Sequence, residues 1–336
     1  MRTITPRLPG SLLLLMTCCV NASGHALTLA DCASIADATK RLACFDALAA
    51  DALGKTAQTP AQRPVPGEVR PTRGESDWLA RHWELDPAHR LGTFIFRPHQ
   101  DNYLLIANYS SSPNEAPFSP FRGLAPEVGR LSRVELKFQL SFKIKLLQDI
   151  SPQHADLWFG YTQQSNWQAY DLKASSPFRD NNYQPELMGV IPVGFQLLGM
   201  RARFVNFGLV HESNGQTLSL SRSWNRFYAQ LGMENGNFAL SARLWKQLGS
   251  NEDNPDIVDY MGHGDVGGTY RRNGHEFSVS ARRNFRTGRG AVRAGWAFPL
   301  NTHIKGYLQA FSGYGHSLID YNHSQTTLGI GVLITE

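Results

Sequence analysis

The stretch "VELKFQLSFKIK" (Val134–Lys145) alternates apolar and polar residues without a break. Successive side chains of a β-strand point to opposite faces, so Val134, Ile144 and the even-numbered residues between them form one apolar face. The other face carries glutamate, glutamine, serine and three lysines. A half-buried strand of a soluble protein could show the same pattern, and this stretch by itself leaves the fold class open.

Similar alternating segments of about ten residues recur along the rest of the chain. They lie near 102–110, 157–166, 184–194, 201–213, 225–234, 238–244, 258–272, 275–284, 289–299, 302–313 and 328–332, which with 134–145 makes twelve candidate strands. The "ENGN" stretch (Glu234–Asn237) contains the Asn-Gly pair that favours a two-residue hairpin turn. Twelve segments over residues 100–336 leave about twenty residues for each strand and its connection, which suits a barrel with short turns at one end.

These patterns predict an all-β protein, a twelve-stranded antiparallel transmembrane β-barrel whose polar face lines the interior and whose apolar face meets lipid. The alternative, a secreted β-sandwich, ranks behind it because the polar face carries many Lys, Arg and Gln residues. We therefore place the barrel domain at residues 95–336.

The N-terminal region predicts export. Residues 1–26 resemble a signal peptide, with Arg2 and Arg7 before "LLLLM" (Leu12–Met16) and "GHA" (24–26) as a small-residue cleavage site. Loss of the two arginines lowers the formal net charge from +5 to +3, too small an excess to predict a nucleic-acid partner.

Residues 27–54 are rich in helix formers and predict a small periplasmic segment of two short helices. Cys32 and Cys44 are the cysteines that remain after the signal peptide, and an oxidising compartment favours a disulfide between them. Residues 55–94 follow as a Pro-rich extended linker.

Three polar residues fall on the apolar side of two neighbouring candidate strands. His211 and Ser213 continue the apolar stripe of residues 205–209, and Asn225 does the same on the returning strand. Polar groups beside lipid are costly unless they satisfy one another, which favours a functional group over an interfacial histidine bonded to a loop. A histidine can accept the proton of a serine that attacks an ester carbonyl, and an asparagine can fix the imidazole tautomer.

Gln163 shares the lipid-facing parity of Leu157, Phe159 and Tyr161. An amide in this place gains by finding a partner, and in a two-fold dimer the same residue of a second subunit can serve. Gln163 therefore predicts a dimer contact, with extension of the side chain to the membrane interface as the alternative.

Several motifs together resemble, in order and spacing, those of the outer membrane phospholipase A family. They are "YTQ" (161–163), "SSPFR" (175–179), "HESNG" (211–215), "SRSWNR" (221–226), "DNPD" (253–256) and "SGYGHSLIDYN" (312–322), and the resemblance covers roughly residues 95–334. It implies a twelve-stranded barrel in the Gram-negative outer membrane, with the N-terminal segment in the periplasm. It also implies a phospholipase A1/A2 that hydrolyses acyl esters of phospholipids and lysophospholipids, requires Ca²⁺ and is active as a homodimer.

The resemblance also implies residue roles. Ser213 would be the nucleophile, His211 the general base and Asn225 the orienting residue, with the backbone N–H of Gly215 donating to the oxyanion. Calcium would bind the Ser221 hydroxyl, the Gln216 carbonyl and Ser175 across the dimer, with Asp253 a ligand of a further site in the monomer. The chain departs from the family at Gln216, where arginine is frequent, and at its non-aromatic end, Ile334-Thr335-Glu336.

A porin-like passive channel is the alternative function. Its candidate lumen carries Lys137, Lys143, Arg226 and Arg243. Since the interior of a twelve-stranded barrel can be filled largely by its own side chains, we expect little conductance. A structural or adhesive barrel, a third alternative, predicts neither calcium dependence nor loss of function on changing His211.

Overall fold

The computed structural model describes residues 29–56, 77–125, 130–173, 175–249 and 252–334. The predicted signal peptide, most of the predicted linker and the last two residues lie outside them. The chain divides into two units, Met1–Pro71 and Thr72–Glu336. Among the described residues, no helix combines the length and the apolar composition needed to cross a membrane.

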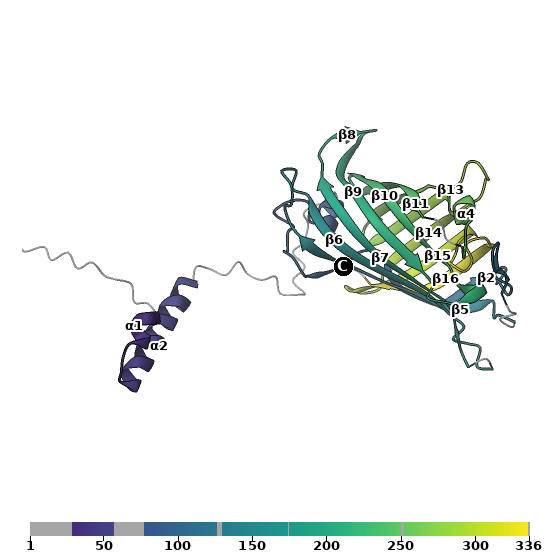
Figure 1. Ribbon diagram of the computed structural model, residues 1–336. Helices are drawn as coiled ribbons and strands as arrows, with labels where there is room; N and C mark the ends of the chain where they lie inside the picture. Colours follow the sequence, from purple (N-terminus) through teal and green to yellow (C-terminus); the bar gives the residue numbers. More distant parts are fainter. Residues whose placement is uncertain (1–28, 57–76, 126–129, 174, 250–251, 335–336) are drawn as a thin grey trace, which may run out of the picture. The chain divides into compact units, whose positions relative to one another are not determined.

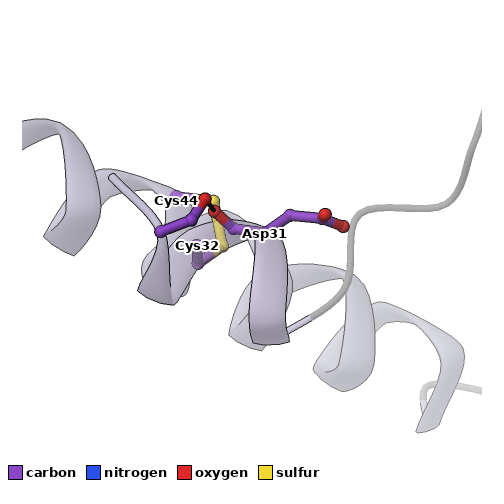
Figure 2. The surroundings of a disulfide bond; sticks show 4 residues. Asp31, Cys32 and Cys44 are labelled. Carbon is purple, nitrogen blue, oxygen red and sulfur yellow. Dashed lines mark hydrogen bonds between the residues drawn. A yellow bond between two sulfur atoms is a disulfide. The ribbon is translucent and has the colours of Figure 1, made fainter. Parts of the chain in front are cut away.

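The first unit contains two helices, α1 (Leu29–Ala33) and α2 (Ala38–Thr56). The Cys32–Cys44 disulfide joins them, with 5.5 Å between the two Cα atoms (Figure 2). At the start of α2 the Asp37 carboxylate accepts the backbone N–H of Lys40 at 3.0 Å, which satisfies one of the unpaired donors of the first turn.

The second unit is a closed barrel of twelve antiparallel strands (Figure 1). The strands are β2 (Asn102–Ser110), β5 (Val134–Leu147), β6 (Asp156–Trp167), β7 (Phe178–Pro192), β9 (Met200–Ser213), β10 (Ser223–Asn235), β11 (Phe238–Leu248), β12 (Gly264–Arg272), β13 (His275–Arg283), β14 (Gly290–Pro299), β15 (Ile304–Tyr314) and β16 (Ser324–Ile334). Each pairs with its neighbour along the chain, and β2 pairs with β16 to close the ring. The predicted fold class is confirmed.

Short additional elements extend the barrel or lie in its loops. β1 (Phe96–Pro98) pairs with β5, and β8 (Gln196–Leu197) pairs with β9. β3 (Phe118–Ser119) pairs with β4 (Gly123–Leu124), and η2 (Leu218–Leu220) is a single 3₁₀ turn.

The burial of β5 shows which way each face points. Lys137 and Lys143 are fully buried, whereas Leu140 on the opposite face is 53% exposed. This is the reverse of a half-buried strand in a soluble protein, where the apolar side chains are the buried ones. The polar face lines the interior, as predicted, and the apolar face is available to lipid.

One predicted strand is wrong in its first part. Residues 258–263 were expected to belong to a strand over 258–272, but Ile257–Met261 form helix α4 and β12 begins at Gly264. Ile257 and Met261 are spaced by one helical turn and are both buried, and Gly262 ends the helix at φ 71°.

The predicted linker is also wrong at its C-terminal end. Trp78–Trp83 form helix α3, in which Leu79 and Trp83 are buried against the barrel interior. The Trp83 ring lies 5.1 Å from that of Phe204, and the N–H of Leu79 donates to Glu234 at 3.0 Å. The two tryptophans and the leucine give this short segment an apolar surface that a solvated linker lacks.

The two ends of the barrel differ in their connections. Six long connections lie at the end where β9 finishes, and we call it the long-loop end: residues 111–133, 168–177, 214–222, 249–263, 284–289 and 315–323. At the opposite, short-loop end the connections include the two-residue turn between β10 and β11, where Gly236 has φ 55°. Helix α3, through Glu234 at the end of β10, also lies at the short-loop end.

Candidate active site

His211 and Asn225 face each other on the outward surface near the long-loop end. The register of β9 and β10 pairs His211 with Asn225 and Ser213 with Ser223. The His211 Nδ1 lies 2.7 Å from the Asn225 Oδ1, and both residues are exposed. Because an amide oxygen can only accept, Nδ1 must carry the proton, which leaves the lone pair of Nε2 available as a base.

Ser213 lies two residues beyond His211 on the same face of β9 and is partly exposed. Among the described residues, no hydrogen bond joins the Ser213 hydroxyl to His211. Catalytic hydrogen bonds are often long in a substrate-free enzyme and tighten when substrate binds. The structure thus brings His211 and Asn225 together and places Ser213 beside them, while the serine–histidine contact remains a prediction.

The inward-facing neighbours of these outward residues join β9 to β10 inside the barrel. Glu212 accepts a hydrogen bond from the Trp224 indole N–H at 2.9 Å and pairs with Arg226 at 2.7 Å. The Arg226 guanidinium also lies 3.9 Å from the centroid of the Trp224 ring. These contacts fix the ends of β9 and β10, and with them the outward residues that alternate along each strand.

The connection after β9 is held closed by Asn214. Its backbone N–H donates to the Arg222 carbonyl at 3.0 Å, and its side-chain oxygen accepts the N–H of Arg222 at 2.9 Å. Its amide nitrogen donates to Asp180 at 3.1 Å. Gly215 follows with φ 63°, and a Cβ at this position would lie 3.2 Å from the Tyr183 ring. Both the left-handed backbone and the close aromatic ring favour glycine here.

The same connection carries two of the predicted calcium ligands. The Ser221 hydroxyl donates to Asp253 at 2.6 Å, so these two oxygen donors lie together. Asp253 also pairs with Arg122 at 2.5 Å. The Gln216 side chain donates to the Arg179 carbonyl and to Asp180, each at 3.3 Å. Its side chain is therefore directed into the protomer, where it supports the loop.

Ser175 lies in a different connection, between β6 and β7. It is exposed and has φ 60°. Within this protomer no hydrogen bond between described residues joins it to Ser221 or Asp253. The structure therefore does not bring Ser175 into the Ser221–Asp253 pair.

Gln163 lies on β6, is half-buried and has contacts within its own strand. It accepts a hydrogen bond from the Tyr161 hydroxyl at 3.3 Å and donates to Ser165 at 3.2 Å. A dimer contact through this amide would add to these bonds or exchange with them.

A buried ionic network beneath the site was not predicted. Arg179 pairs with Glu135 and with Asp320, each at 2.9 Å. Asp180 accepts the backbone N–H of Ile319 at 3.1 Å. Residues 315–323 are thus tied to the start of β7, the strand that also holds Asn214 and Gln216. In the sequence, Arg179 and Asp320 are marked only by belonging to the motifs at 175–179 and 312–322.

Two groups in the connection over residues 315–323 have displaced pKa values. Burial opposes ionisation of Asp320, but the Arg179 guanidinium and the Ser317 hydroxyl outweigh it, and the pKa of this carboxyl is lowered. Burial, with the positive charge of Lys137, lowers the pKa of His316 well below its usual range. His316, 3.1 Å from the Lys137 ammonium, is therefore neutral. The network contains an ionised carboxylate and an uncharged imidazole.

Comparison with known proteins assigns the chain to a family. A sequence profile described as Phospholipase A1 matches residues 79–334. A putative phospholipase A1 of Neisseria meningitidis serogroup B is 38% identical over 94% of this chain and 93% of its own. The phospholipase A1 of Salmonella typhimurium is 39% identical over 72% of this chain and 82% of its own.

Solved structures agree with this assignment. Outer membrane phospholipase A from Escherichia coli aligns with a TM-score of 0.67 at 35% identity, over 72% of this chain and 94% of that one. The Salmonella typhi outer membrane phospholipase, a dimer with bound calcium, aligns with a TM-score of 0.69 at 36% identity, over 75% of this chain and 95% of that one. The chain belongs to the phospholipase A1 family, a family of ester hydrolases of the Gram-negative outer membrane.

Proposed function

We propose that this protein is a calcium-dependent, dimerisation-activated phospholipase A that cleaves acyl esters of phospholipids and lysophospholipids at its lipid-facing surface. The observation that carries the proposal is the 2.7 Å hydrogen bond between His211 and Asn225, two polar residues on the outward face of the barrel. An imidazole held in one tautomer beside lipid, with a serine hydroxyl two residues away, suits attack on an ester that the membrane itself supplies.

The proposed reaction uses these three side chains. The Ser213 oxygen attacks the ester carbonyl carbon while His211 Nε2 takes its proton, and Asn225 keeps the ring oriented. His211 then gives this proton to the departing oxygen of the lysophospholipid, which leaves an acyl group on Ser213. Water, deprotonated by His211, then attacks the acyl-serine, and His211 returns this proton to the Ser213 oxygen as the fatty acid leaves. The N–H of Gly215 would donate to the oxyanion in both steps.

The residues near the serine fit calcium. The Ser221 hydroxyl and the Asp253 carboxylate already lie 2.6 Å apart, and the Gln216 carbonyl belongs to the same connection as Ser221. Calcium prefers oxygen ligands of this kind. A bound cation would stabilise the negative charge that develops on the substrate oxygen. Calcium is also present in the Salmonella typhi relative.

A dimer would complete the site in this proposal. Ser175 is exposed and separate from Ser221 within one protomer, so it is available to the site of a second copy. Gln163 marks the surface at which the copies would meet, and the Salmonella typhi relative is a dimer. A requirement for two copies would spare the membrane, since an isolated protomer lacks part of the calcium site.

The barrel interior does not favour the channel alternative. A cavity of 380 Å³ is lined at the short-loop end by Trp78, Leu79 and Trp83 of α3. A second cavity of 120 Å³ is lined at the long-loop end by residues 316–318. Side chains from the two ends of the barrel thus narrow the interior, in keeping with the low conductance expected from the strand number.

The test is fatty-acid release from mixed micelles of phospholipid and detergent, with calcium and then with a chelator. We expect release by the wild-type protein only with calcium, and none by Ser213→Ala. Ser312→Ala is the matched control, since Ser312 is an exposed serine on the outward side of β15. It should release fatty acid at the wild-type rate. Release that persists in Ser213→Ala, or in chelator, would overturn the proposal.

A further measurement tests activation by dimerisation. Cross-linking combined with activity should show release only in samples that contain dimer, and a fully active monomer would exclude activation by dimerisation.

A further inference from the structure

Two cations lie on the outward face of the barrel near the long-loop end. Lys246 is exposed on β11 between Leu244 and Leu248, which are 71% and 41% exposed. Arg283 is exposed at the end of β13, where it continues the outward stripe of Phe277 and Val279. A charge on a lipid-facing strand is costly unless it reaches the interface or meets an opposite charge.

The sheet register places these cations on the two strands that flank β12. Leu244 pairs with Gly264, and the pairing of Asp265 with Arg282 sets Gly264 beside Arg283. Gly264 occupies the outward position of β12 between the strands of the two cations and offers no side chain. Since adjacent strands lie about 4.8 Å apart, the strands of Lys246 and Arg283, with β12 between them, are about 10 Å apart.

The Arg283 side chain reaches toward the loop over residues 284–289. A Cβ built on Gly288 would lie 3.9 Å from an Nη of Arg283. In the same loop Phe285 is 91% exposed. The side chain of Arg286 is 75% exposed, and it pairs with Asp259. The long-loop end near β11 and β13 therefore presents the cations Lys246, Arg283 and Arg286. It also carries Asp259, which is paired with Arg286, and the exposed ring of Phe285.

Lys246 and Arg283 have no carboxylate partner among the residues that the structure describes. Both would lie where the outward face meets the headgroup layer, because long basic side chains extend toward the interface. A phosphate ester is the anion that this layer supplies, and it accepts hydrogen bonds from both ammonium and guanidinium groups.

We propose that Lys246 and Arg283 bind the phosphate headgroup of an anionic membrane lipid, with Phe285 inserted at the boundary between headgroups and acyl chains. Arg283 lies four strands from His211 and three from Asn225, whereas Lys246 lies on the strand beside Asn225. The proposed lipid site therefore borders the ester-cleaving residues, but neither of its cations belongs to them.

The experiment uses ether-linked lipids, which contain no acyl ester and cannot be cleaved. The protein is reconstituted in bilayers of dialkyl phosphatidylcholine with one-fifth dialkyl phosphatidylglycerol. The lipids that remain bound after detergent extraction are then counted by native mass spectrometry. We expect the wild-type protein to retain phosphatidylglycerol above its share of the bilayer.

Single variants should weaken this preference by about fivefold each, the effect of one basic residue near a charged membrane surface. The variants are Lys246→Gln and Arg283→Gln, with Lys246→Arg expected to keep the preference. Arg272→Gln is the matched control, because Arg272 is an exposed outward arginine at the short-loop end of β12. Equal thermal unfolding of all variants in detergent confirms that each is folded.

Three outcomes would overturn the proposal. Unchanged retention in the double variant would mean that the two cations only extend into water. An equal loss in Arg272→Gln would indicate a general effect of net charge. Displacement of the lipid by millimolar inorganic phosphate would indicate a site for the free anion.

Discussion

The two faces of the β9–β10 pair use similar residues for opposite purposes. On the outward face His211 and Asn225 form one hydrogen bond and remain exposed. On the inward face Glu212 and Arg226, their immediate neighbours in the sequence, are bonded to each other and to Trp224. Glu212, Arg226 and Trp224 inside the barrel bond to one another and hold the strands, whereas His211 and Asn225 outside keep unused capacity for a ligand.

Substitutions at neighbouring residues of one strand should therefore affect different properties, activity for an outward residue and stability for an inward one. An outward change removes a group that acts on substrate and leaves the strand contacts intact. An inward change leaves a buried partner unsatisfied, which destabilises the barrel.

The largest effect is expected for His211→Ala. Loss of the base should lower the rate of fatty-acid release by about 10⁴-fold, as for loss of a triad member elsewhere. Because the side chain is exposed and its one hydrogen bond is to the exposed Asn225, the urea midpoint in detergent should stay within experimental error of the wild type. If the variant unfolded at a lower urea concentration than the wild type, His211 would contribute to stability like the inward residues.

Glu212→Ala should have the next largest effect, now on stability. It leaves the Arg226 guanidinium, whose side chain is 6% exposed, without its carboxylate. Removal of one partner from a buried pair costs about 3 kcal/mol of unfolding free energy, measurable by urea titration in detergent. Asp259→Ala is the control, since its pair with Arg286 is largely exposed and should contribute less than about 1 kcal/mol. Equal costs for the two variants would contradict the inward role.

Asn225→Ala should lower activity by less than the loss of His211. The imidazole keeps its position on β9 but loses the acceptor that fixes its tautomer, and we expect a decrease of about 10²-fold in fatty-acid release. Asn225→Asp retains an acceptor oxygen at the same place and should recover most of that loss. If Asp restored no more activity than Ala, orientation of the ring would not be the function of this residue.

The smallest effect concerns pH and the inward network. The pKa of Asp320 is lower in the folded protein than in the unfolded chain. Its contribution to stability is therefore fully present above the unfolded value of about 3.9 and is lost as the pH falls through the lower folded value. Asp320→Asn should reduce the unfolding free energy at neutral pH by about 1.5 kcal/mol and flatten its decline below pH 4. If the unfolding free energy of Asp320→Asn, measured by urea titration, declined below pH 4 as steeply as that of the wild type, Asp320 would not cause the decline.

Most of the barrel could be predicted because alternation is a local property. Ten residues of one strand, such as those after Val134, show which face is apolar without any knowledge of their partners. Residues 258–263 were assigned wrongly because Ile257, Val258 and Met261 are compatible with either period in so short a stretch. Helix α3 was missed because its six residues follow a Pro-rich segment and have no repeat of their own.

The site was predicted in part for a related reason. His211, Ser213 and Asn225 stand out because they violate the local alternation on adjacent strands. The bonds from Arg179 to Glu135 and Asp320 join residues 44 and 141 positions apart, and they exist only once the barrel closes. No pattern within one strand reports such a contact, and the direction of the Gln216 side chain depends on the same network.

Helix α3 has a consequence for the order in which the protein is built. It precedes every strand in the chain, yet its contacts are with β6, β9 and β10 and, through Glu84, with Lys145 of β5 at 3.0 Å. None of these surfaces exists until the middle of the barrel has been synthesised, exported and paired. Helix α3 is therefore exported before the strands that it contacts, and it can dock only after those strands have paired.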